Sequence, residues 1–180
     1  MIRIIFESHG TTIDNELGLS SGHYDTELSE LGRRQAKELG ERHAQTNLAT
    51  VFCSDLRRSY NTAKIAFNGR DIPIIQDRRL REVDYGEMTR HDEIEIIYKK
   101  PDCISEPFPN GESYAQTTAM IKEFLSDLMK NYEGKTVMVI GHRATQYGLE
   151  NLINGVALEK IIASPWHWQP GWHYKLARVD

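Results

Sequence analysis

The chain has 180 residues, of which 39% are hydrophobic and 27% charged, and its formal net charge is -4 at pH 7. This length favours a single domain over residues 1–180. The negative charge argues against nucleic-acid or anionic-membrane partners, and no apolar run approaches the roughly 20 residues that span a bilayer. The first residues lack the apolar core of a signal peptide, and Cys53 and Cys103 fit no CxxC motif. We therefore expect a cytoplasmic protein with reduced thiols.

Strand-like and helix-like segments alternate along the chain. Apolar runs predict strands at 2–6, 50–53, 72–75 and 136–140, with the tail at 172–179 as a fifth candidate. Amphipathic segments predict helices after Ser29 and at 56–67, 91–98, 112–131 and 144–153. This order is typical of the α/β class, and it predicts a three-layer α/β/α sandwich with a mostly parallel sheet.

Two details of these elements can be read from single residues. Ser29 is the expected N-cap of the first long helix, whose inner face should carry Leu31, Ala36 and Leu39. Pro73 has no N–H to give to a neighbouring strand, so the strand at 72–75 is expected at an edge of the sheet.

Two histidines directly follow buried strands. His9 comes after the first strand, within Glu7-Ser8-His9-Gly10, and His142 comes after the strand at 136–140. Ligands gather at the carboxyl ends of parallel strands, so the two histidines indicate one site. A metal site is disfavoured because no third ligand stands at a recognisable spacing. A Ser8–His9 hydrolase pair is rejected because neighbours on an extended segment point to opposite faces, and no GxSxG motif is present.

Two further segments carry residues that suit an oxyanion. Arg57 and Arg58 open the helix after the second strand, where free N–H groups and guanidinium donors can bind a phosphate. We expect Arg58 to serve that role and Arg57 to form surface ion pairs. Glu82 and Asp84 follow the third strand. An acid beside a phosphate can protonate a leaving oxygen, a role that fits Glu82 better than Asp84.

Taken together, these segments resemble the histidine phosphatase superfamily, which includes the cofactor-dependent phosphoglycerate mutases. Ser8-His9-Gly10 matches the family's Arg-His-Gly signature in two of three positions. Residues 54–63 resemble the second motif, residues 80–86 the acid-bearing segment, and Gly141-His142 the motif of the second histidine. The resemblance spans nearly the whole chain and implies a phosphoglycerate mutase-like fold.

The resemblance also implies a chemistry. A small phosphorylated metabolite would be hydrolysed as a phosphomonoester through a phosphohistidine on His9, with Glu82 as proton donor. Arg58 and His142 would hold the phosphoryl oxygens. Further substrate contacts would come from Asn15, Ser21 and Gly22. Neither a metal nor a cofactor is implied.

Ser8 departs from the family, in which an arginine precedes the nucleophilic histidine. Loss of one preorganised donor typically costs about 10²–10³ in rate. Arg143, directly after His142, is the prime candidate to replace the missing cation. The site can instead take a substrate whose charge is placed differently, or the chain can be a regulatory pseudoenzyme that binds a phospholigand. A phosphoglycerate mutase is a minor alternative, because the chain lacks the long insertions of the larger mutases.

The segment 165–174 holds all three tryptophans of the chain. These rings can form a wall or lid over an organic leaving group, pack on the sheet, or bury a homodimer contact. We favour a structural role. His23, His43 and His91 are expected to be solvated surface groups, with His23 the best candidate for an exception because it follows Ser21-Gly22.

Overall fold

A computed structural model describes residues 1–177 around a five-stranded sheet. The strands are β1 (Ile2–Ser8), β2 (Thr50–Cys53), β3 (Ile74–Gln76), β4 (Thr136–Gly141) and β5 (Trp172–Leu176). Their order across the sheet is β3-β2-β4-β1-β5; β5 runs antiparallel to β1, and the other neighbours are parallel. β3 lies at an edge, as Pro73 predicts. The tail strand ends at Leu176, and residues 178 and 179 of the expected segment lie outside the described residues 1–177.

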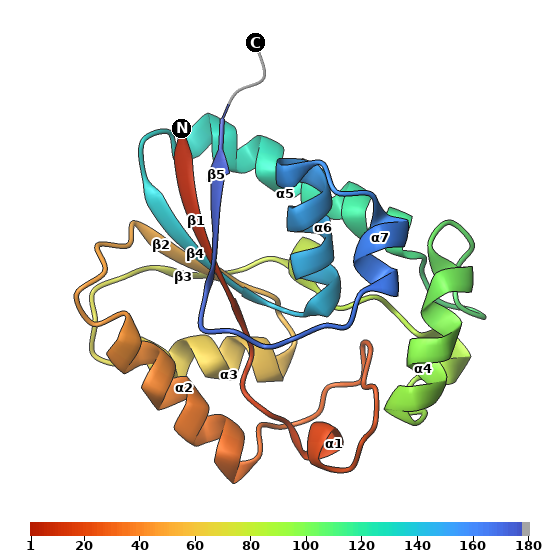
Figure 1. Cartoon of the computed structure of the whole chain (residues 1–180). Helices are drawn as coiled ribbons and strands as arrows, with labels where there is room; N and C mark the ends of the chain where they lie inside the picture. Colours follow the sequence, from red (N-terminus) through yellow and green to blue (C-terminus); the bar gives the residue numbers. More distant parts are fainter. Residues whose placement is uncertain (178–180) are drawn as a thin grey trace.

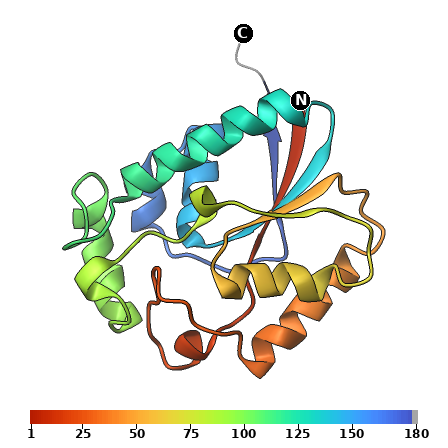
Figure 2. The same cartoon turned by 180° about the vertical axis from the view of Figure 1, so that it is seen from behind.

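Helices cover both faces of the sheet, which confirms the predicted three-layer architecture (Figure 1). The helices are α1 (Ile13–Glu16), α2 (Glu30–Arg42), α3 (Arg57–Ala66), α4 (Glu93–Lys99), α5 (Tyr114–Asn131), α6 (Arg143–Asn154) and α7 (Leu158–Ala163). The long helix α5 runs along one face, and α2 and α3 lie on the other (Figure 2). None of the helices within residues 1–177 is long and apolar enough to cross a membrane.

Alternation along β1 builds the two cores on either side of the sheet. Ile4 and Phe6 pack with α5 and α6, whereas Ile5 packs with α2 and α3. One expectation for α2 is wrong: Leu31 is 40% exposed, because the helix turns Gly32, Ala36 and Leu39 inward. Gly32, three residues after the N-cap Ser29, has no side chain, which lets the backbones approach closely.

That close approach fixes the loop after β1. A Cβ on Gly32 would collide with the carbonyl oxygen of Thr11, and a Cβ on Gly10 would lie 2.5 Å from the carbonyl oxygen of Gly32. The backbone of α2 therefore rests directly on the loop that carries His9. The same loop is also joined to the end of β4, because the His9 N–H donates to the Gly141 carbonyl at 3.1 Å. The ends of β1 and β4 are thus level, with Ser8 opposite Gly141.

Candidate active site

A pocket of about 540 Å³ opens at the carboxyl ends of the strands. Its lining includes eight of the nine predicted site residues: Ser8, His9, Asn15, Ser21, Gly22, Arg58, Glu82 and Arg143. The ninth, His142, is buried behind the pocket, and its ring centre lies 5.0 Å from that of His9. The structure therefore gathers residues from four distant segments of the chain around one cavity.

His9 is held in a form that suits a nucleophile. Its Nδ1 lies 2.7 Å from the Gly10 carbonyl oxygen, which can only accept, so Nδ1 carries a proton and donates it. Nε2 then keeps its lone pair. Burial, together with the positive charge of Arg58, lowers the pKa of His9 from 6.5 to about 3. The ring is therefore neutral at physiological pH.

This lowered pKa predicts a pH-dependent stability. Because the pKa of His9 falls from 6.5 to about 3 on folding, its contribution to stability is complete above pH 6.5 and is lost as the pH falls toward 3. We predict that the free energy of unfolding of the wild type falls more steeply over this range than that of His9→Gln, whose side chain does not titrate. Urea unfolding at a series of pH values measures both slopes, and equal slopes would contradict the prediction.

Arg58 is a buried cation beside His9. Its Nη2 donates to the Gly22 carbonyl at 2.7 Å and its Nη1 to the Tyr24 carbonyl at 3.0 Å, which aims the guanidinium from the start of α3. Arginine stays charged in proteins, so the pocket keeps a fixed positive charge. Arg57 instead pairs with Asp25 and Glu27 on the exposed surface, as predicted.

His142 has a partner that the sequence did not single out. Its Nε2 lies 2.7 Å from the buried Ser54 hydroxyl oxygen. Among residues 1–177, its Nδ1 has no hydrogen-bond partner. Burial and the charge of Arg58 hold the pKa of His142 well below its ordinary value, so this ring is also neutral. Ser54 stands in the segment 54–63, but a serine beside a strand end carries no distinctive signal.

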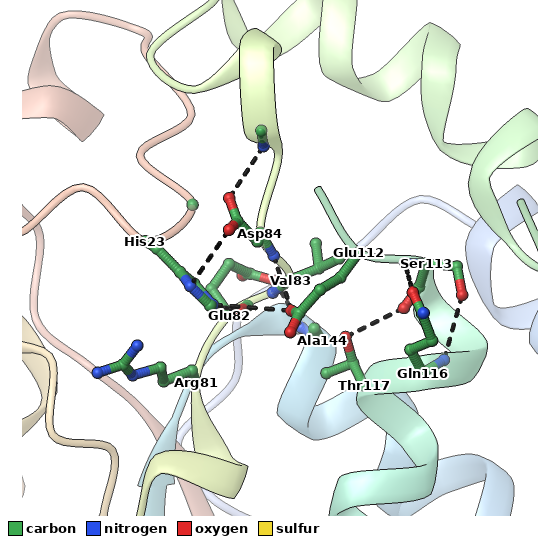
Figure 3. A network of polar contacts seen from close by, with 12 residues as sticks. His23, Arg81, Glu82, Val83, Asp84, Glu112, Ser113, Gln116, Thr117 and Ala144 are labelled. Atoms are coloured by element: carbon green, nitrogen blue, oxygen red, sulfur yellow. Dashed lines mark hydrogen bonds and ion pairs between the residues drawn. The ribbon is translucent and has the colours of Figure 1, made fainter. Parts of the chain in front are cut away.

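Glu82 is buried, with its carboxyl group at the beginning of α6. Its Oε1 accepts the N–H of Val83 at 2.9 Å and that of Ala144 at 3.2 Å (Figure 3). Both donors fix this one carboxyl oxygen with respect to the pocket. Asp84, by contrast, is half-buried and lies in a network with His23 and Glu112, outside the pocket lining.

His23 contacts the backbone of the segment that carries Glu82. Its Nε2 lies 2.8 Å from the Glu82 carbonyl oxygen, and its Nδ1 lies 3.6 Å from Asp84 Oδ2 (Figure 3). Because a carbonyl oxygen only accepts, Nε2 donates to it. His23 is therefore the expected exception among the surface histidines, although it contacts the backbone of the acid segment and does not line the pocket.

Arg143 lines the pocket that Ser8 also lines. Its Nη1 lies 2.7 Å from Glu93 Oε1, and its guanidinium carbon lies 4.8 Å from the ring centre of Trp166. The positive charge of Arg143 also helps to lower the pKa of His9. Arg143 therefore lines the same pocket as Ser8, and Arg57 does not.

The remaining predicted substrate contacts shape the loops of the pocket. Asn15 Oδ1 accepts the Thr12 N–H at 3.0 Å as part of the cap of α1. Ser21 donates through its hydroxyl to the buried Asp14 carboxylate at 3.0 Å. Gly22 has a φ of 51°, in the left-handed region that favours glycine, and a Cβ there would lie 2.9 Å from the Tyr85 ring.

The structure corrects two expectations. His43 is buried, not solvated, and its Nε2 lies 2.8 Å from Oε1 of the buried Glu7. The expected structural role of the tryptophans holds in part: Trp172 packs against Phe6 and Trp166 stacks on Trp172, but Trp166 and Trp168 also line the pocket. His91 is exposed and pairs with Glu95, as expected.

Within residues 1–177, no group of three or more His, Cys, Asp or Glu side chains is arranged to hold a metal ion.

The pocket thus joins a neutral histidine, a buried cation and a buried acid, a set suited to transfer of a phosphoryl group. A family model of the histidine phosphatase superfamily (branch 1) matches residues 4–168. The chain belongs to this superfamily, and its fold is phosphoglycerate mutase-like as predicted.

Individual relatives point the same way. The chain is 29% identical to Phosphoserine phosphatase 1 of Hydrogenobacter thermophilus, over 89% of this chain and 80% of that protein. It is 27% identical to the Adenosylcobalamin/alpha-ribazole phosphatase of Salmonella typhimurium, over 93% and 85%. The structure of YhfR from Bacillus stearothermophilus superposes with a TM-score of 0.84 at 28% identity, covering 94% of this chain and 88% of that one. These similarities support a phosphatase, and hence a hydrolase, of the superfamily.

Proposed function

We propose that this chain hydrolyses a small phosphorylated metabolite as a metal-independent phosphomonoesterase, through a phosphohistidine on His9. The observation that carries the proposal is the shared pocket of a neutral His9, the buried Arg58 and the buried Glu82. The names of the relatives support the reaction class. They differ in substrate, so we leave the metabolite at the level of a small phosphomonoester.

In the first step, Nε2 of His9 attacks phosphorus in line with the leaving oxygen. The N–P bond forms as the P–O bond to the leaving group breaks, and Glu82 in its acid form gives its proton to that oxygen. Arg58 balances the charge on the phosphoryl oxygens. The proton of Nδ1, donated to Gly10, fixes the ring so that Nε2 alone can react.

In the second step, Glu82 accepts a proton from water as the water oxygen attacks phosphorus. The P–N bond breaks, and Nε2 recovers its lone pair. We assign the proton of His142 to Nδ1, because the Ser54 hydroxyl can donate to Nε2. The Nδ1–H, which has no hydrogen-bond partner among residues 1–177, then donates to a phosphoryl oxygen.

Arg143 replaces the family arginine that Ser8 removes. Its ion pair with Glu93 is half-exposed on both sides, so exchange of that carboxylate for a phosphoryl oxygen costs little. Arg143 also begins α6, next to the buried His142. The positive charge lost at position 8 is therefore supplied from the end of the neighbouring strand.

Replacing Arg143 by alanine should lower kcat/KM about 10²–10³-fold, the usual effect of losing one preorganised donor. Arg57→Ala is the matched control and should stay near the wild type, because Arg57 pairs on the surface. Ser8→Arg added to Arg143→Ala should recover part of the loss, which a purely structural role of Arg143 would not allow. An Arg143→Ala variant within about threefold of the wild type would contradict this assignment.

One observation favours a second candidate, a module that binds a phospholigand without turning it over: Ser8 stands where the family has an arginine. Hydrolysis of para-nitrophenyl phosphate with a chelator present separates the two. Turnover that is lost in His9→Ala supports the enzyme. Binding of inorganic phosphate by calorimetry without any turnover supports the module.

A further inference from the structure

The pocket is larger than a phosphate requires. Its volume of about 540 Å³ lies in the range of sites that enclose whole organic ligands. The cavity runs from His9 to the inner side of α2, where Gln35, Leu39 and Arg42 line it. We call residues 164–171, which connect α7 to β5, the tryptophan strap. It crosses the carboxyl ends of the strands (Figure 1) and places Trp166 and Trp168 in the wall of the pocket.

Trp166 already has two ring partners within the protein. The Arg143 guanidinium covers it at 4.8 Å, and the Trp172 ring stacks against it with centres 5.8 Å apart and an interplanar angle of 27°. Trp166 therefore anchors the strap to the sheet and helps to position Arg143.

Trp168 differs in that 57% of its surface is exposed although it lines the pocket. Its one described aromatic or cationic contact is the Arg42 guanidinium, 5.9 Å from the ring centre. The indole of Trp168 thus offers a flat apolar surface to a ligand bound in the pocket.

Arg42 is itself held by a buried acid. Glu7 is only 1% exposed; its Oε2 lies 3.2 Å from Arg42 Nη2, and its Oε1 lies 2.8 Å from His43 Nε2. Removing Arg42 from Glu7 would leave a buried charge short of a partner, which is strongly unfavourable. The contact with Glu7 therefore holds Arg42 in place at the pocket wall. Arg42 serves as a fixed support for one face of Trp168.

We propose that Trp168 is a specificity-determining residue that stacks against a planar aromatic group in the leaving alcohol of the substrate. This inference rests on the proposed function and names its substrate class: phosphomonoesters that carry an aryl or heteroaryl ring. The phosphate lies between His9, Arg58 and Arg143, and the ring lies against the open face of Trp168. Offset stacking between aromatic rings supplies the preference.

Two phosphonates, which cannot be hydrolysed, test the preference without any need for turnover. Phenylpropylphosphonate and cyclohexylpropylphosphonate have similar bulk, but only the first has a planar ring. By calorimetry, the wild type should bind the phenyl compound roughly 2- to 12-fold more tightly, the range expected for one aromatic pair. Trp168→Leu should bring the two affinities together. Tyr98→Ala, which removes another exposed aromatic ring outside the pocket lining, should keep the preference.

Equal binding of the two phosphonates by the wild type, or a preference that survives in Trp168→Leu, would overturn the proposal. A complete failure of both compounds to bind would overturn it together with the proposed function. A preference that depends on Trp168 in a chain without turnover would uphold the aromatic site and reject the hydrolase, so the two failures are distinguishable.

Discussion

His9→Ala is expected to lower kcat for a phosphomonoester by about 10⁴–10⁶-fold, because removal of a covalent nucleophile leaves only the contribution of binding and charge. The variant should still bind inorganic phosphate, since Arg58 and Arg143 are untouched. Steady-state hydrolysis by freshly purified wild type and variant measures the effect, with circular dichroism to verify the fold.

His91→Ala is the matched control for this experiment. His91 is exposed and, among residues 1–177, its side chain pairs only with Glu95, so its removal should leave the rate within about twofold of the wild type. A His9→Ala variant that retains a tenth or more of the activity would show that the covalent route is wrong.

Glu82→Gln is expected to give the second large effect, and its size should depend on the leaving group. Glutamine keeps an oxygen to accept the N–H groups of Val83 and Ala144, but it has no proton to give. For an alkyl phosphate, whose alkoxide leaves poorly, we predict a loss of about 10²–10⁴-fold in the rate of phosphorylation of His9. For para-nitrophenyl phosphate the loss should be below about tenfold, because nitrophenolate leaves without a proton.

Rapid-quench measurement of the first turnover with both substrates tests this prediction. Glu112→Gln is the control, because Glu112 is the neighbouring acid in the same network but contacts the backbone of Asp84 (Figure 3). Equal losses with both substrates in Glu82→Gln would mean that Glu82 positions the site and does not protonate the leaving group.

The strand ends are the part of this site that local sequence predicts well. Apolar runs before His9 and His142 define β1 and β4, and parallel pairing then brings the two rings within 5.0 Å. Short elements such as α1 and α7 carry too few residues for a periodic signal, so they escape prediction. The single-domain organisation, the cytoplasmic location and the homodimer stay predictions.

Burial that depends on a distant partner is what local sequence does not reveal. The sequence suggests that Glu7 is the first polar residue of a loop, but it is a buried acid because Arg42 at the end of α2 and the C-cap residue His43 supply its partners. The sequence likewise suggests that His43 is a surface group, because its distant partner Glu7 is not apparent from the local sequence. The three tryptophans within 165–174 predict an aromatic cluster. Which ring packs on the sheet and which rings line the pocket depends on the path of the tryptophan strap, which the local sequence does not reveal.

Direct detection of the phosphorylated enzyme tests the central claim most directly. The wild type is mixed with a phosphomonoester, quenched in alkali within the first turnover, and analysed by peptide mass spectrometry, because phosphohistidine survives alkali and is lost in acid. We predict a phosphoryl group on the peptide that contains His9, labile to acid and absent from His9→Ala. Turnover without any such adduct, or an adduct on another residue, would contradict the account.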